Sequence, residues 1–203
     1  MRAKRAVRQY IQWNSEVYEN ENRVYTDMDG NSYSFSHLNT IENHPLKYEF
    51  KQGDIKRKGH VLVDIVFDHH CYTKEKNAGD TNVTLVTEYF DNGSTKERVF
   101  DLERYSYTHS LVAVIKGISH KTCRASRVSG KAIRLEEQDR QRPNAGIYIL
   151  MKMKLKDEKL TLFVETCHRR SNEPYDLQLQ DRPERYMLIL GRWLRDLWPS
   201  LVQ

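Results

Sequence analysis

The chain has 203 residues, of which 38% are hydrophobic and 30% charged, and its net charge is +5 at pH 7. This size and balance predict one folded domain over residues 1–203 and exclude a disordered chain. No apolar stretch reaches the roughly 18 residues of a membrane helix, and no apolar signal core follows the basic start, so we expect no membrane partner and a cytoplasmic location.

The three cysteines, Cys71, Cys123 and Cys167, are far apart and form no CxxC pair. This pattern predicts reduced thiols that pack as small hydrophobic groups. A zinc site built with His168 is the alternative, but neighbouring strand residues such as Cys167 and His168 point to opposite faces. The sequence also lacks a glycine-rich phosphate loop and the HExxH motif. We therefore expect no metal and no cofactor.

The first half of the chain predicts mainly strands. Residues 1–25 are expected to form a short helix or an arm, because Tyr10, Trp13 and Val17 recur at helical spacing. A turn signal at residues 27–31 then predicts a hairpin, and residues 46–50 alternate as a strand. Residues 61–72 give the clearest strand, with Val61, Val63, Ile65 and Phe67 expected on its buried face.

In the second half, the turn at residues 91–94 predicts a hairpin, and helical spacing over 102–118 predicts a helix with Asp101 as its N-cap. Residues 119–145 are polar and are expected to form a mobile loop or short strands. A hairpin over residues 147–165 should set Met151 opposite Val164 and Leu150 opposite Glu165. Residues 183–197 predict a helix that packs against the rest of the domain.

The predicted fold class is therefore α+β, with a mainly antiparallel sheet of about five to seven strands covered by the helices near 102–118 and 183–197.

The densest group of reactive side chains lies at Asp68, His69 and His70. Histidine titrates near neutrality, and a neighbouring carboxylate can orient it, so this group predicts acid–base chemistry. If the strand continues, His69 and His70 point to opposite faces and only one of them can belong to a site. Its expected partners are Arg104 on the helix and Glu165 on the hairpin. A hydrogen-bonded structural histidine is the alternative interpretation.

A basic tract within residues 119–145 is the expected nucleic-acid contact. It comprises Arg124, Arg127, Lys131 and Arg134, interleaved with acidic residues. Basic side chains in a loop suit RNA or DNA phosphates, but the mixed charges are also typical of a solvated loop.

Four short segments resemble a known group of proteins: Ser-His-Leu-Asn at 36–39, Phe-Asp-His-His-Cys-Tyr-Thr at 67–73, Glu-Arg-Tyr at 103–105 and Leu-Phe-Val-Glu-Thr at 162–166. Together they resemble small uncharacterised bacterial proteins that are sometimes labelled growth-adaptation proteins. The resemblance spans much of residues 33–168 and implies a grouping without an activity.

Two functional hypotheses follow. The first is a small, metal-independent endoribonuclease of the toxin type, with His69 or His70 as acid or base and Arg104 stabilising the phosphate charge. The second is a non-catalytic module that contacts nucleic acid or a protein partner through the basic loop and the C-terminal helix.

Overall fold

The computed structural model describes residues 7–19, 23–126, 132–135, 146–156, 159–170, 179 and 182–202. The chain divides into two compact units, each made from two segments. Unit 1 comprises Met1–Asn39 and Tyr72–Ser106, and unit 2 comprises Thr40–Cys71 and Tyr107–Gln203.

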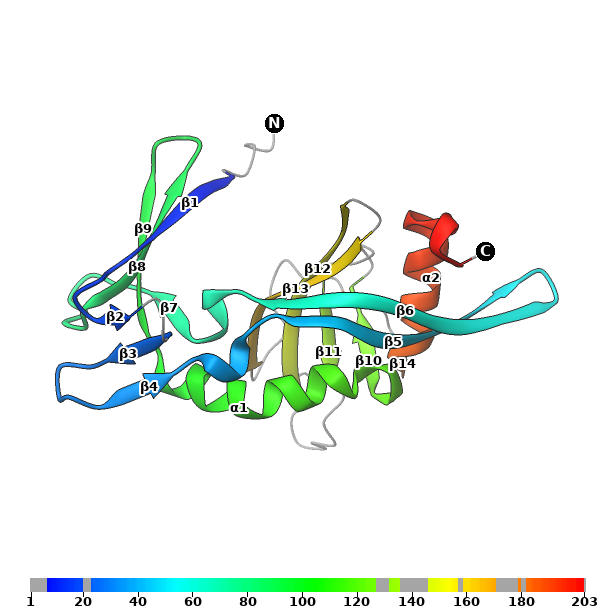
Figure 1. The fold of residues 1–203 in the computed structure, drawn as a ribbon, viewed down its shortest axis with the longest axis horizontal. Coiled ribbons are helices and arrows are strands. Elements are labelled where there is room, and N and C mark those ends of the chain that lie inside the picture. Colours follow the sequence, from blue (N-terminus) through cyan, green and yellow to red (C-terminus); the bar gives the residue numbers. More distant parts are fainter. Residues whose placement is uncertain are drawn as a thin grey trace. The chain divides into compact units, whose positions relative to one another are not determined.

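Unit 1 contains two antiparallel sheets (Figure 1). The four-stranded sheet has the order β1-β8-β9-β7, with β1 at Arg8–Trp13, β8 at Thr84–Phe90, β9 at Thr95–Phe100 and β7 at Thr73–Glu75. The three-stranded sheet joins β2 (Tyr18–Glu19), β3 (Val24–Thr26) and β4 (Ser32–Ser34). Both hairpins predicted in this part of the chain, β3–β4 and β8–β9, are confirmed. Their turns place Gly30 and Gly93 at positive φ, a conformation that glycine adopts without a steric penalty.

Aromatic rings fill the interior of unit 1. The ring of Phe35 is fully buried and stacks on Tyr72 at a centroid distance of 4.0 Å. Tyr105, from the start of helix α1 (Leu102–Lys116), meets Phe35 edge to face at 5.5 Å. Such offset and perpendicular contacts add to the stabilisation that burial of the rings provides. The core of this unit therefore joins the N-terminal segment to residues that follow Cys71.

Unit 2 is built on a seven-stranded sheet with the order β14-β10-β11-β12-β13-β6-β5. The strands are β5 (Ile41–Gln52), β6 (Ile55–Phe67), β10 (Thr122–Ala125), β11 (Ala132–Leu135), β12 (Gly146–Lys156), β13 (Lys159–Arg170) and β14 (Glu184–Arg185). All neighbours are antiparallel except β13 and β6, which are parallel. The expected α+β class with a mainly antiparallel sheet is confirmed.

Two helices complete the fold, as predicted. The side chain of Asp101 caps α1 by accepting the backbone N–H of Arg104 at 2.9 Å. Helix α2 (Tyr186–Leu197) buries Ile189, Leu190 and Leu194 in unit 2. Short 3-10 turns occupy Ser36–Leu38, His69–Cys71, Ile118–His120 and Pro199–Val202. No helix within the described part of the chain is both long enough and apolar enough to cross a membrane.

The structure corrects one expectation about secondary structure and decides between two alternatives for another segment. A strand, β1, stands where the aromatic spacing predicted a helix, because Tyr10 pairs across the sheet with Tyr89 and their rings stack at 4.4 Å. Cross-strand aromatic pairs of this kind favour a sheet over a short isolated helix. Of the two alternatives predicted for residues 119–145, a mobile loop or short strands, the described part contributes the short strands β10 and β11; the rest of that segment lies largely outside the described residues.

Candidate functional site

Strand β6 ends at Phe67, and the chain then turns sharply through Asp68. The backbone N–H of Asp68 donates to the carbonyl of Val164 on β13 at 2.9 Å, directly after the residue pair of Phe67 with Val164. The carbonyl of Asp68 accepts the N–H of Cys71, and its Oδ1 accepts the N–H of His70 at 3.1 Å. An aspartate that accepts the N–H two residues later is typical of a turn. The His69–Cys71 segment is therefore a 3-10 turn and not a continued strand.

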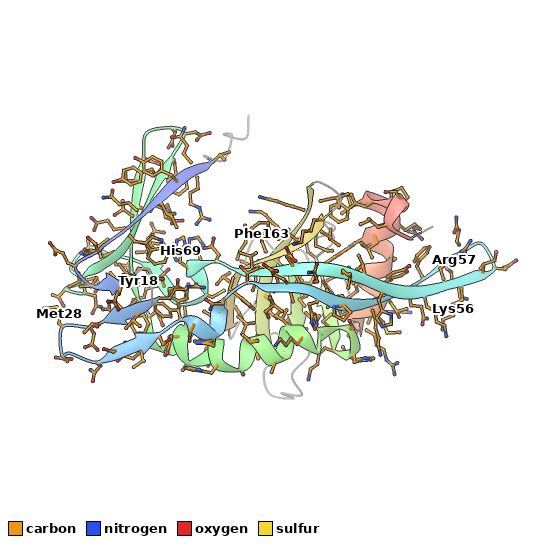
Figure 2. The ribbon with its side chains drawn as sticks, in the orientation of Figure 1. Tyr18, Met28, Lys56, Arg57, His69 and Phe163 are labelled. Carbon is orange, nitrogen blue, oxygen red and sulfur yellow. The ribbon has the colours of Figure 1, made fainter. Side chains whose placement is uncertain are left out.

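This turn corrects the expectation that the two histidines lie on opposite faces. A 3-10 turn has about three residues per revolution, so consecutive side chains no longer alternate. Oδ1 of Asp68 lies 3.1 Å from Nδ1 of His69 and 3.8 Å from Nδ1 of His70. The two imidazole rings are 4.5 Å apart and nearly perpendicular. Asp68, His69 and His70 thus form one group, defined here as the Asp-His-His turn (Figure 2 labels His69).

The three side chains differ in their access to solvent. The side chain of His69 is 2% exposed, that of Asp68 is 17% exposed, and that of His70 is 29% exposed. A group that transfers protons to a substrate must reach it directly or through one water molecule. His70 meets this condition, whereas His69 is enclosed by the protein. The geometry therefore assigns the accessible chemistry of the turn to His70.

The same group has the donor atoms for a metal ion. One ligand atom from each of Asp68, His69 and His70 lies within 4.8 Å of the other two. Imidazole nitrogens and a carboxylate oxygen suit zinc and other first-row divalent ions. The three cysteines are all buried, and Sγ of Cys71 donates to the carbonyl of Val164 at 3.5 Å. The side chain of His168 lies outside the described residues, so the zinc alternative that includes it stays a prediction.

Strand β13 holds the turn in place through the residues on both sides of Glu165. Besides Val164, Thr166 contacts the turn, because its hydroxyl donates to the carbonyl of His70 at 3.4 Å. Met151 pairs with Val164, as predicted, but Leu150 pairs with Thr166. Glu165 is therefore the extra residue of a β-bulge, which the predicted register had placed opposite Leu150.

The carboxylate of Glu165 has a described partner on the neighbouring strand. It forms an ion pair with the ammonium group of Lys152, and both side chains are substantially exposed. Glu165 is thus on the strand that supports the Asp-His-His turn, and its carboxylate pairs with a lysine.

Arg104 belongs to unit 1, whereas the other four predicted catalytic residues belong to unit 2. Its Nη1 donates to the carbonyl of Thr73 at 2.6 Å, which links the start of α1 to β7. Arg98 donates to the same carbonyl at 3.1 Å. The described contact of Arg104 is therefore within unit 1, and its part in a phosphate site stays a prediction.

The predicted basic surface is only partly described. Arg124 on β10 and Arg134 on β11 pair directly across two antiparallel strands. Arg134 is 4% exposed, so most of its side chain is not available to a partner. Arg127 and Lys131 lie outside the described residues. Strand pairing, rather than a solvated loop, sets the positions of the two described arginines.

A second basic surface lies on the β5–β6 hairpin. Lys47, Lys51, Lys56 and Lys58 are exposed there, and the strands alternate so that these lysines share one face. The sequence carried a signal for it, since Lys-Arg-Lys at 56–58 follows a Gly-Asp turn closely. Sequence reasoning missed this surface because the strand was expected to begin only at residue 61.

The comparison with known protein families matches residues 22–194 to the YjaZ family. No curated protein and no solved structure matches the chain. The match covers most of the chain, including the Asp-His-His turn, the β5–β6 hairpin, helix α1 and most of helix α2. The match agrees with the resemblance of the sequence to a group of small uncharacterised bacterial proteins. The growth-adaptation label of that group stays a prediction. The chain belongs to the YjaZ family.

Proposed function

We propose that this protein is a small, metal-independent endoribonuclease in which His70 is the acid–base group. One observation carries the proposal: an accessible imidazole lies 3.8 Å from a carboxylate oxygen, in a turn fixed to the sheet by β13. Imidazole is the side chain whose ordinary pKa lies nearest neutrality, which suits it to proton transfer. RNA supplies its own nucleophile, so such an enzyme needs few groups.

The proposed reaction is an internal transesterification. The imidazole of His70 accepts the proton of the 2′-hydroxyl while the 2′-oxygen forms a bond to the adjacent phosphorus. The bond from phosphorus to the 5′-oxygen breaks, and the leaving oxygen takes a proton from the imidazolium. The products are a 2′,3′-cyclic phosphate and a free 5′-hydroxyl. No electron acceptor or metal-bound water is required.

Asp68 is the proposed positioning residue. Its carboxylate lies beside both imidazoles and would stabilise a positive charge on His70 when the proton is held there. Its Oδ1 also accepts the backbone N–H of His70, which fixes the turn.

The test is cleavage of a fluorescently labelled RNA that contains both a stem and a single-stranded loop, with and without EDTA. We expect cleavage in EDTA, a cyclic phosphate product, and a loss of about 100-fold or more in His70→Ala. His120→Ala is the matched control, because His120 is an exposed histidine on another turn. Absence of cleavage by the wild-type protein, or equal cleavage by His70→Ala, would overturn the proposal.

Asp68→Asn separates catalysis from folding. Asparagine keeps an oxygen that can accept the N–H of His70, but it removes the charge beside the imidazole. We expect the variant to lose most of its cleavage rate while its free energy of unfolding in urea stays within about 1 kcal/mol of the wild type. A cleavage rate equal to that of the wild type would remove Asp68 from the mechanism.

A non-catalytic nucleic-acid-binding module is the second candidate. The exposed lysines of the β5–β6 hairpin favour it, because they supply a contact surface that needs no catalytic group. The expected result for this candidate is binding of the labelled RNA without any cleavage.

A further inference from the structure

The β5–β6 hairpin has two chemically different faces. Antiparallel pairing sets Lys47 opposite His60, Glu49 opposite Lys58, and Lys51 opposite Lys56. Cross-strand partners lie on the same side of a sheet, so these six residues form one face, defined here as the basic face. The turn between the strands includes Gly53 at a φ of 61°, which favours glycine.

The opposite face carries apolar residues that are covered within unit 2. Leu46 and Phe50 are buried there. Helix α2 approaches β5 so closely that a Cβ on Gly191 would lie 2.2 Å from the carbonyl oxygen of Glu49. Figure 1 shows the hairpin tip extending past α2. The packing thus orients the hairpin, leaving the basic face in solvent.

Charge and exposure distinguish the basic face from an ordinary polar strand. All four lysines and His60 are exposed, and the face has a single carboxylate, Glu49, whose Oε1 lies 2.7 Å from Nζ of Lys56. Arg57 adds a further positive charge near the tip (Figure 2), although it pairs with Phe50 and so lies on the opposite face. On β6, Lys56 and Lys58 are two residues apart, about 6.7 Å along the strand, whereas Lys47 and Lys51 on β5 are four residues apart with Glu49 between them.

We propose that the basic face binds the phosphate backbone of double-stranded RNA. Its six positions carry no Phe, Tyr or Trp, and therefore offer no aromatic platform for the unstacked bases of a single strand. Lysine ammonium groups contact phosphates as point charges and do not read base edges in a bidentate way. Duplex RNA is recognised mostly by its shape and its backbone.

The proposal deepens the proposed ribonuclease function and rests on it for the identity of the nucleic acid. Strand β6 connects the two features, since Lys58 lies near one of its ends and the Asp-His-His turn follows the other. Ten residues separate Lys58 from Asp68, which corresponds to about 33 Å along an extended strand. A stem held at the basic face could therefore present a loop, several nucleotides away, to His70.

The test is fluorescence anisotropy with a labelled RNA duplex at several salt concentrations, using Lys51→Gln/Lys56→Gln/Lys58→Gln. We expect the affinity near 0.1 M salt to fall by about 10- to 100-fold, and the dependence of log K on log salt to become shallower by about 2 to 3. The matched control is Lys96→Gln/Lys116→Gln/Lys121→Gln, which removes the same charge from exposed lysines elsewhere. Its affinity should fall by less than about threefold.

Several outcomes would overturn the proposal: no binding of duplex RNA at low salt, equal losses in the two triple variants, or tighter binding of a single strand or of duplex DNA by the wild type. Circular dichroism checks that both variants are folded.

The two proposals can be overturned independently of each other. His70→Ala should bind duplex RNA as the wild type does. If the wild type binds duplex RNA through the lysines but does not cleave it, only the proposed ribonuclease function is overturned. If the lysine variant binds duplex RNA and cleaves RNA as the wild type does, only the proposal that the basic face binds RNA is overturned.

Discussion

The carboxylate of Glu88 and the guanidinium of Arg98 form a buried ion pair in unit 1, with Oε2 and Nη1 3.4 Å apart. Their side chains are 2% and 9% exposed, so both charges have been removed from water. Arg8 adds a second contact, 2.9 Å from Oε1 of the same carboxylate. Arg98 is held further by Thr73, whose hydroxyl and carbonyl oxygens accept its Nε and Nη2 protons.

Glu88→Gln should destabilise the protein strongly. Removing one partner of a buried ion pair leaves the other charge buried without compensation, which typically costs about 3 to 5 kcal/mol. Urea denaturation followed by circular dichroism measures the loss. Glu97→Gln is the control: this carboxylate lies 3.6 Å from Lys76, its side chain is 54% exposed, and such pairs contribute less than about 1 kcal/mol. Equal effects of the two substitutions would contradict the assignment.

Gly191→Ala should also destabilise the protein, although alanine is the better helix former. In an exposed helix interior this change usually stabilises by about 1 kcal/mol. Here the new methyl group would meet the backbone of Glu49 at 2.2 Å, so α2 would have to move away from β5. We expect a net loss of about 1 to 3 kcal/mol in the free energy of unfolding.

Gly117→Ala is the matched control for this substitution. Its Cβ would lie 3.5 Å from the carbonyl oxygen of Ala113, which is an ordinary contact, and its φ is −92°. We expect a change of less than about 1 kcal/mol. If Gly191→Ala were as stable as the wild type, α2 would not pack against β5 as closely as described.

The sequence predicts those parts of the fold that depend on local signals. Alternation placed Val63 and Ile65 on the buried face of β6, and turn residues located two hairpins correctly. The pairing of β13 with β6 was not predictable in this way, because it joins segments that are about a hundred residues apart. Likewise, the stacking of Tyr10 on Tyr89 outweighed the helical spacing of the N-terminal aromatics.

The candidate site shows the same limit. Sequence patterns located Asp68, His69 and His70, but they could not show where strand β6 ends. That end depends on a hydrogen bond to Val164, far along the chain, and on the side chain of Asp68 accepting the N–H of His70. The bulge at Glu165 is equally hidden, because it is evident only from the pairing of Met151 with Val164 and of Leu150 with Thr166. Long-range contacts therefore decide which face each histidine occupies.

The thiols should be unreactive in the native protein. All three cysteines are buried, and burial raises the pKa of the Cys167 thiol to about 12. Because the thiolate is the reactive form, little of it is present at neutral pH. A colorimetric disulfide reagent such as DTNB should titrate fewer than one thiol in the native protein and all three in denaturant. Rapid reaction of a native thiol would contradict this packing.

Acid should weaken the protein partly through Asp64. Its carboxylate accepts the N–H of Asn43 at 3.0 Å and forms an ion pair with Lys159 at 2.7 Å. The hydrogen bond from Lys159 is the largest cause that holds the pKa of Asp64 below its usual 3.8, followed by that from Asn43. Because folding lowers this pKa, the unfolded chain takes up the proton at a higher pH than the folded chain. The stabilisation is therefore present above the ordinary carboxyl pKa and is lost as the pH falls through the lowered one.

Asp64→Asn tests this linkage, since asparagine can still accept the N–H of Asn43 but does not titrate. We expect the variant to be less stable than the wild type near neutral pH, and the difference to shrink as the pH falls from about 5 to about 3. Urea denaturation at a series of pH values measures both quantities. Asp54→Asn, at the exposed tip of the β5–β6 hairpin, is the control for a general change in charge. A stability difference for Asp64→Asn that stays constant down to the lowest pH would show that the ion pair with Lys159 does not supply the stabilisation.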